Sequence, residues 1–278
     1  LIDGEIVAAA QEERFTRIKG DASFPKHAIA YVFQEANIEP KDLDAVAFYE
    51  KPLLKFERLL ETYHAFVPFG LGSFLKAMPI WLKDKLFIRR KTKAYFKEMG
   101  FLNVPIFFPE HHLSHAASAF YPSPFQKATI LTLDGVGEWS TLTIGVGEGN
   151  HIRILREQHF PHSLGLLYSA FTYFLGFTVN NGEYKVMGLA AYGNPKSEET
   201  QTFFRKILEN LVDLREDGSF LLNMDYFDFA VGLTMTKDNV WHALFKMDRR
   251  TKDQKLTQQH ANMALAIRSE EHTSELQS

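Results

Sequence analysis

ATILTLDGVGEWSTLTIGVGEGNHIRILREQHF, residues 128–160, is the stretch that decides the fold. Three apolar runs at 128–133, 140–146 and 152–155 alternate with the glycine-rich segments DGVGE and GEGN. Short apolar runs separated by Gly and Asp turn residues are typical of antiparallel strands joined by hairpins. The stretch therefore predicts a three-strand meander.

The N-terminal residues repeat this pattern loosely. Residues 5–15 (EIVAAAQEERF), like 151–160 (HIRILREQHF), begin with an apolar run and leave it through polar residues that end in Phe. The pair Leu1–Ile2 precedes them across an Asp-Gly turn, so we expect two paired strands, over residues 1–2 and 5–9.

Between the two meanders the pattern changes from strand to helix and back. Pro25 can open a helix, because Ala28, Ile29, Val32 and Phe33 follow it at helical spacing. We expect further helix over most of 53–100, and the predicted short strands are 44–49 and 104–108.

Two halves that each open with a meander and continue into helix and strand indicate an α/β fold of the actin-like, ribonuclease-H-like type. We expect a first subdomain over 1–125, lacking its opening strand and carrying a helical insertion at about 53–100, and an incomplete second subdomain over 126–267. In this architecture a nucleotide lies in the cleft, and glycine-rich turns approach its phosphates.

Both ends of the chain are unusual. The sequence starts without Met inside the first hairpin pattern, so we expect the natural chain to begin before Leu1. Residues 268–278 (RSEEHTSELQS) match the in-frame translation of a sequencing-library adapter. We exclude them from functional reasoning and expect the natural chain to continue past Ile267.

Composition removes several classes of function. The formal net charge of −3 argues against nucleic-acid binding, and the lack of cysteine excludes disulfides and thiolate metal ligands and fits a cytoplasmic location. Residues 64–82 are apolar, but Lys76 and two prolines interrupt them, so they fall short of the roughly 18 apolar residues of a membrane span. We expect buried or lid-forming helices there, which would suit a homodimer contact if exposed.

The sharpest chemical signal is HHLSHAASA, residues 111–119. His111 and His115 are four residues apart, so on a helix both imidazoles lie on one face and can share a metal ion. Spacing alone favours a metal pair and an ordinary capping or core pair equally. Asp134, which follows an apolar strand and precedes Gly135 and Gly137, adds a carboxylate and favours a metal site.

Two later segments carry weaker signals for an anionic ligand. In PHSLGLLY (161–168), Ser163 is a candidate N-cap whose helix could bind an anion, although the residues alone favour an ordinary cap. In GEYKVMG (182–188), Glu183 and Lys185 suit ribose or phosphate, and they also suit a surface loop. The candidate nucleotide-binding residues are Gly135, Gly137, Ser163, Gly165, Glu183 and Lys185.

Five blocks resemble, in the same order, segments of the O-carbamoyltransferase family, whose members modify nodulation factors, cephalosporins and aminoglycosides. The resemblance covers residues 1–267. The blocks are DGEIVAAAQEERFTRIKGDASFP, HHLSHAASAFYPSPF, ATILTLDGVGEWSTLTIG, PHSLGLLYSAFTYFLGF and GEYKVMGLAAYG.

The resemblance implies transfer of a carbamoyl group from carbamoyl phosphate to a hydroxyl of a small-molecule or sugar acceptor. ATP and a separate C-terminal domain would supply carbamoyl-adenylate. A divalent metal, iron in this family, would be held by His111, His115 and Asp134, with Asp134 also counted as catalytic. Lys19 matches a lysine that positions the carbamoyl donor, and Glu183 and Lys185 match the nucleotide side of the cleft.

The resemblance also implies that this chain is inactive alone. The family's catalytic histidine would precede Leu1, and a further metal-binding Asp would follow Ile267. Two other functions stay open: an actin-like sugar or metabolite kinase, which would not need the two histidines, and a non-catalytic nucleotide-binding protein.

Overall fold

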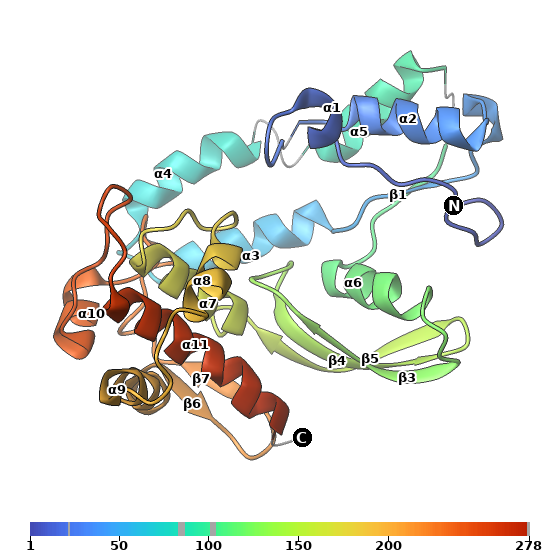
Figure 1. The fold of residues 1–278 in the computed structure, drawn as a ribbon. Coiled ribbons are helices and arrows are strands. Elements are labelled where there is room, and N and C mark those ends of the chain that lie inside the picture. The colour runs from blue at the N-terminus through green and yellow to red at the C-terminus, as the bar shows by residue number, and fades with distance from the viewer. Residues whose placement is uncertain (22, 83–86, 101–103, 277–278) are drawn as a thin grey trace. The chain divides into compact units, whose positions relative to one another are not determined.

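The computed structural model describes residues 1–278 except 22, 83–86, 101–103 and 277–278 (Figure 1). The chain divides into two compact units. The first comprises Leu1–Phe48 and Phe87–Phe108, and the second comprises Tyr49–Leu86 and Pro109–Ser278.

The first unit is mostly helical, with one pair of short parallel strands. Val46 pairs with Ile106 and Ala47 with Phe107. The expected helix after Pro25 and the two expected strands are thus confirmed, although the strands are shorter than predicted. The elements of this unit are α1 (Glu13–Thr16), α2 (Lys26–Ala36), η1 (Pro40–Asp42), β1 (Val46–Ala47), α5 (Ile88–Glu98) and β2 (Ile106–Phe107).

The expected N-terminal strand pair is wrong beyond its turn. Asp3 and Gly4 adopt positive φ and make a tight turn, and Ile2 and Glu5 form an isolated antiparallel bridge across it. Residues 6–10 form no strand. A hairpin of this size lacks the third strand and apolar face that would stabilise it.

Glu12 anchors the start of α2. Its carboxylate accepts hydrogen bonds from the backbone N–H groups of His27 (3.2 Å) and Ala28 (2.9 Å), and it contacts the His27 ring. Pro25, the residue before α2, makes no side-chain cap, so Glu12 satisfies these amides from a distance in sequence. Burial opposes ionisation, but the hydrogen bonds with Ala28 and His27 lower the pKa of Glu12 overall.

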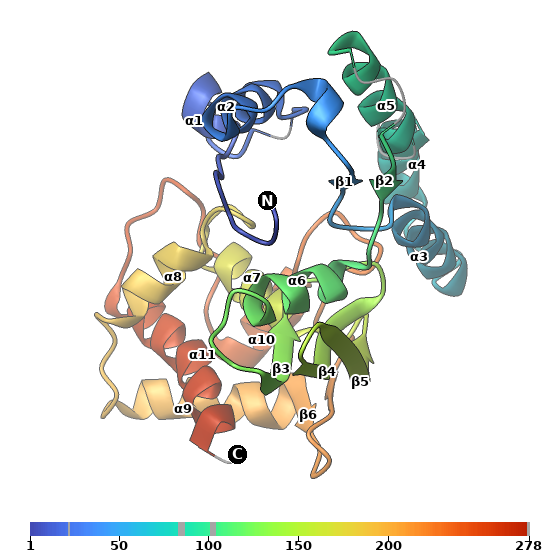
Figure 2. The ribbon, with the colours of Figure 1, turned by 90° about the vertical axis from the view of Figure 1, so that its right-hand side faces the viewer.

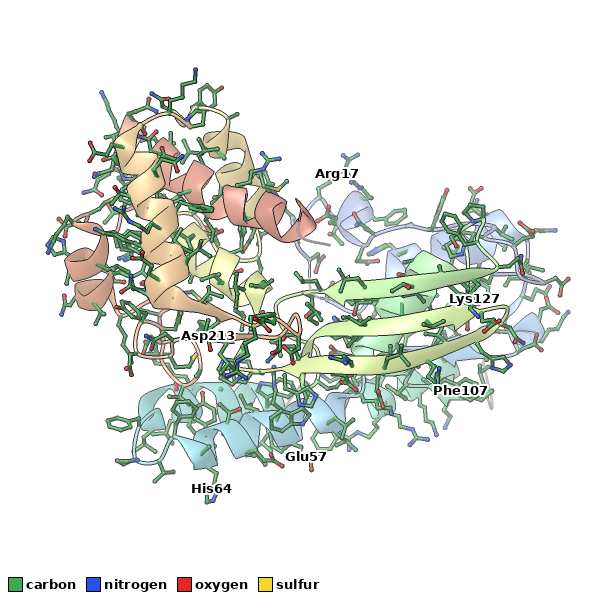
Figure 3. The ribbon with its side chains drawn as sticks, turned by 90° about the horizontal axis from the view of Figure 1, so that it is seen from below. Arg17, Glu57, His64, Phe107, Lys127 and Asp213 are labelled. Atoms are coloured by element: carbon green, nitrogen blue, oxygen red, sulfur yellow. The ribbon has the colours of Figure 1, made fainter. Side chains whose placement is uncertain are left out.

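The second unit contains the predicted meander. Strands β3 and β4 pair antiparallel, with Leu133 opposite Leu142, and β4 continues antiparallel to β5. Figure 1 shows α6 across one face of this sheet, and Figure 3 shows the opposite face. The strands of the unit are β3 (Lys127–Leu133), β4 (Ser140–Glu148), β5 (His151–His159), β6 (Val212–Leu214) and β7 (Phe220–Leu222).

Helix α6 is held on the sheet by Phe120 and Ala116, which pack on Ile130. Gly147 makes room for this contact, since a Cβ atom there would lie 2.7 Å from the Phe120 ring. The helices of the unit are α3 (Pro52–Ala65), α4 (Leu71–Ile80), α6 (His111–Phe120), α7 (Leu164–Phe174), α8 (Glu183–Ala190), α9 (Glu198–Lys206), the π-helical turn η3 (Ile207–Leu211), α10 (Asp238–Phe245) and α11 (Gln258–Leu276).

The main core surrounds Trp241 of α10. The centroid of its ring lies 4.8 Å from the ring centroid of Phe171 and 4.9 Å from that of Phe174, both on α7. The ring centroids of Phe227 and Phe245 lie at 6.0 and 5.4 Å. The Trp241 indole N–H donates to the Tyr226 carbonyl, so its polar atom is satisfied. Helices α8, α9 and α11 pack together beside this cluster (Figure 2).

The α/β character of the chain is confirmed, and the actin-like arrangement stays a prediction. The helix expected over most of 53–100 is confirmed as α3, α4 and α5, while 83–86 lie outside the described residues, and its being an insertion in a subdomain stays a prediction. The division near residue 125 also stays a prediction.

Within the described part of the chain, no helix combines the length and apolar character needed to cross a membrane. In the apolar segment 64–82, Phe69 and Leu75 are 73 and 63% exposed. The segment is therefore not buried throughout, and the lid-forming role and the homodimer contact stay predictions.

Phe174→Ala will lower the free energy of unfolding by about 3–5 kcal/mol, because it leaves a cavity beside Trp241. Phe125→Ala is the matched control: Phe125 is exposed, and its loss will change stability by less than about 0.5 kcal/mol. Urea denaturation of both variants checks this, and equal effects would contradict the assigned core.

Glu12→Gln will destabilise the first unit at pH 7, and this effect will shrink as the pH falls through the folded pKa of Glu12. The pKa of Glu12 is lowered on folding, so the carboxylate stabilises the fold above its unfolded pKa of about 4.3. This contribution is lost as the pH falls through the folded pKa. Thermal unfolding of parent and variant across this range measures the gap, and a gap independent of pH would refute the capping role.

Candidate metal centre

Helix α6 starts at His111, and Glu138 fixes that start. The Glu138 carboxylate accepts the backbone N–H of His111 at 3.0 Å and that of Lys51, which precedes α3, at 2.7 Å. Glu138 is only 7% exposed. One carboxylate from the turn after β3 thus binds backbone amides at the starts of two helices, and it places His111 opposite the end of β3.

The three predicted metal ligands come together at this point. His111 Nε2 lies 2.8 Å from Asp134 Oδ2 and 3.0 Å from His115 Nε2, and His115 Nε2 lies 3.7 Å from the same carboxylate oxygen. Donor atoms that share one metal ion at about 2.1 Å lie about 3.0–3.4 Å apart. The observed separations bracket this range, so the donor set fits one small divalent ion.

The protonation states also suit metal binding. Burial alone would raise the pKa of Asp134, but its hydrogen bonds with His111 and His112 and their charge lower it well below its usual range. Burial and the neighbouring His111 lower the pKa of His115. An ionised carboxylate and a neutral imidazole are the forms that ligate metals. That these residues bind a metal ion stays a prediction.

The Asp134 turn packs against the first turn of α7. Ser163 is the N-cap of α7, as expected: its hydroxyl accepts the N–H of Leu166 at 3.0 Å and donates to the carbonyl of Gly135 at 2.7 Å. A Cβ atom on Gly165 would overlap the Asp134 carbonyl oxygen. Ser163 and Gly165 therefore hold the backbone of the predicted ligand.

The other glycine of this turn has a packing role as well. A Cβ atom on Gly137 would lie 3.0 Å from His111 Cβ, so glycine there lets α6 approach the turn without a tight contact, whereas Gly135 is less crowded. Nucleotide contacts for Gly135, Gly137, Ser163 and Gly165 stay predictions.

Glu183 and Lys185 lie on α8 and face different surroundings. The Glu183 carboxylate accepts from Asn180 N–H (2.9 Å), Gly182 N–H (3.1 Å) and the Ser169 hydroxyl (3.0 Å), so it caps its own helix. Lys185 is exposed. Lys19 belongs to the first unit, and the roles predicted for these three residues stay predictions.

Arg58 is a buried cation that sequence reasoning missed. It is 9% exposed, and its guanidinium lies 5.0 Å from the Phe160 ring centroid. Burial lowers the pKa of Arg58 to about 10, opposed by the charges of Asp134, Glu138 and Glu50. Among the described residues its Nη1 atom has no hydrogen-bond partner. An arginine in an amphipathic helix carries no sequence signal that separates this place from an exposed one.

Glu50 is a second missed residue. His111 Nδ1 is buried and without a hydrogen-bond partner in the described chain, and Glu50 Oε2 lies 3.8 Å from it. Glu50 also pairs with Lys55 at 2.8 Å. A carboxylate on the far nitrogen of a metal-binding histidine commonly orients its ring.

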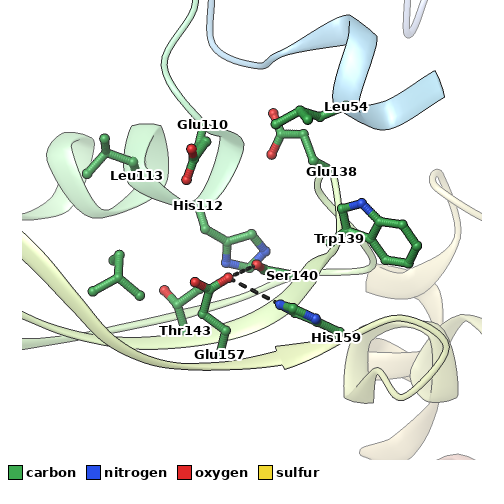
Figure 4. A pocket seen from close by; sticks show the side chains of 11 residues that line it. Leu54, Glu110, His112, Leu113, Glu138, Trp139, Ser140, Thr143, Glu157 and His159 are labelled. Carbon is green, nitrogen blue, oxygen red and sulfur yellow. Dashed lines mark hydrogen bonds and ion pairs between the residues drawn. The ribbon is translucent and has the colours of Figure 1, made fainter. Parts of the chain in front are cut away.

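A pocket of about 240 Å³ adjoins the centre (Figure 4). His112 and Glu138 line it on the side of α6, and Glu157 of β5 contacts Ser140 and His159 on the opposite side. Its lining mixes carboxylates, the hydroxyls of Ser140 and Thr143 and the Trp139 ring. Such a surface can accept hydrogen bonds from a polar molecule brought next to the centre.

Gly165→Ala will destabilise the fold by about 1–3 kcal/mol, because the new methyl group must displace the Asp134 turn. Gly188→Ala is the control: Gly188 lies inside α8 with open space around it, and alanine there will stabilise by about 0.5–1 kcal/mol. Chemical denaturation measures both. A neutral Gly165→Ala would refute the close contact between α7 and the Asp134 turn.

Comparisons with known proteins identify a matching family model and several relatives of this chain. The family model for the carbamoyltransferase N-terminus matches residues 1–271. An uncharacterized protein of Synechocystis is 54% identical over 95% of this chain and 43% of its own length. The nodulation protein NolNO of Sinorhizobium fredii is 32% identical over 95% of this chain and 35% of its own.

An uncharacterized protein of Methanocaldococcus jannaschii is 30% identical over 67% of this chain and 38% of its own. The chain thus spans between about a third and under half of the length of these relatives. From the matched family model and these identities, the chain belongs to the carbamoyltransferase family, of which it carries the N-terminal domain.

Proposed function

We propose that this chain provides the metal-binding part of an O-carbamoyltransferase. The complete enzyme would transfer a carbamoyl group from carbamoyl phosphate, by way of carbamoyl-adenylate made from ATP, to a hydroxyl of a small-molecule or sugar acceptor. The observation that supports this proposal most directly is that ligand atoms of His111, His115 and Asp134 lie within 4.8 Å of one another. Family membership supports the reaction class.

The metal, when bound, supplies a Lewis acid toward a carbonyl or phosphoryl oxygen. The chain's own residues prepare for it. The lowered pKa of Asp134 keeps its carboxylate charged, and that of His115 keeps its imidazole available as a lone-pair donor. Two imidazoles and a carboxylate suit iron and other first-row divalent ions.

Attack by the acceptor requires that its hydroxyl proton be removed. The family resemblance assigns this base to a histidine before Leu1, and it assigns the adenylate-forming step to a domain after Ile267. Lys19 would offset negative charge on the adenylate. On this account the chain binds metal but does not complete the reaction.

His111→Ala combined with His115→Ala will abolish specific binding of Co²⁺, used as a probe for the divalent ion, with an affinity loss above about 100-fold. Two of three protein donors are lost, so the remaining carboxylate binds no better than an exposed one. Isothermal titration at pH 8 measures this. His151→Ala, an exposed histidine on β5, is the control and will bind Co²⁺ like the parent. Unchanged binding by the double variant would overturn the site.

In the full-length protein, the same double variant will lose acceptor-dependent consumption of carbamoyl phosphate. Release of phosphate and carbamoylated product, followed with labelled carbamoyl phosphate and mixed hydroxyl acceptors, measures the activity. ATP-dependent phosphorylation of an acceptor that survives loss of both histidines would instead establish a kinase. ATP binding without carbamoyl phosphate consumption by the parent would establish a non-catalytic nucleotide-binding protein.

A further inference from the structure

His112 stands between the two predicted ligands in sequence but faces the sheet instead of joining them. It is 4% exposed. Its Nε2 atom lies 3.2 Å from Asp134 Oδ1, and its Nδ1 atom lies 2.6 Å from the Thr132 hydroxyl. The carboxylate oxygen that His112 contacts is therefore not Oδ2, the oxygen closest to His111 and His115.

The chain of hydrogen bonds continues into the sheet. The Thr132 hydroxyl lies 2.6 Å from that of Thr143. These two threonines are directly opposite each other on β3 and β4, and both are buried. Because strand pairing fixes their backbones, the register of the meander determines the position of the Thr132–Thr143 end of this series of hydrogen bonds.

Only one arrangement of protons satisfies every atom of this chain when His112 is neutral. His112 Nε2 faces a carboxylate oxygen of Asp134, which accepts, so Nε2 carries the proton and donates it. Nδ1 must then accept, which requires the Thr132 hydroxyl to donate. The Thr132 oxygen is left to accept from the Thr143 hydroxyl.

We propose that His112, Thr132 and Thr143 are positioning residues for the Asp134 carboxylate. They hold Oδ1 through a directed hydrogen-bond chain, so that Oδ2 stays turned toward His111 and His115. This inference rests on the proposed metal function, and it adds residues that do not themselves bind the ion. Partners of this kind fix the orientation of a ligand and strengthen its binding.

A purely structural role would also keep these residues buried, so the test needs a matched buried threonine. Thr141 lies on β4 and is 1% exposed. Its single hydroxyl proton points to the carbonyls of His162 (2.6 Å) and Gln158 (3.1 Å), and it takes no part in the hydrogen bonds of His112. Thr141→Val removes a buried, hydrogen-bonded hydroxyl from the sheet, as Thr132→Val does, without changing the contacts of His112.

Thr132→Val will weaken Co²⁺ binding by about 10–100-fold at pH 8, whereas Thr132→Ser will restore it and Thr141→Val will leave it at the parental value. Isothermal titration gives the affinities, and the visible absorption of bound Co²⁺ will shift in Thr132→Val alone. Circular dichroism confirms that each variant is folded.

A second readout does not use metal. Nitrogen-15 NMR of ring-labelled, metal-free protein at pH 8 will show the ring proton of His112 on Nε2 in the parent. The Nδ1–H tautomer there would overturn the proposal, as would equal Co²⁺ affinity in Thr132→Val and the parent, or equal weakening in Thr141→Val. If the parent binds no Co²⁺, the metal function itself fails and the positioning role fails with it.

Discussion

The backbone of the turn at Asp134 is packed so closely against the first turn of α7 that residue 165 must be glycine. The Ser163 hydroxyl joins the same two segments by donating to Gly135. On the other side of the turn, Gly137 admits His111, and Glu138 binds the first amide of α6. The turn that follows β3 is therefore packed between the first turns of α6 and α7. The positions of Asp134, His111 and His115 depend on this packing.

Part of this arrangement follows from sequence patterns alone. Four-residue spacing places His111 and His115 on one helical face, and the apolar run before Asp134 places its carboxylate at a strand end. The meander is confirmed because each of its strands has a partner. The N-terminal residues that loosely repeat the pattern of the meander do not form the expected strand, because residues 6–10 resemble a strand but have no strand partner.

The rest depends on contacts between segments that are distant in sequence. The role of His112 requires the register that sets Thr132 opposite Thr143, and no local pattern reveals that register. Glu138 lies in a turn whose composition suggests only a hairpin, although its carboxylate reaches Lys51 and His111. Glu183 lies in a segment whose composition suits a nucleotide or a surface loop, and its oxygens accept hydrogen bonds at the start of its own helix; a nucleotide contact there stays a prediction.

The central claim is that two imidazoles and one carboxylate of this chain hold a single divalent ion. X-ray absorption spectroscopy of the protein loaded with one equivalent of Zn²⁺ tests it most directly, because imidazole rings add outer-shell scattering that carboxylates and water do not. The account predicts two histidine ligands, with oxygen donors completing the shell. A spectrum with no histidine scattering, or with only weakly bound aqueous ion, would contradict it.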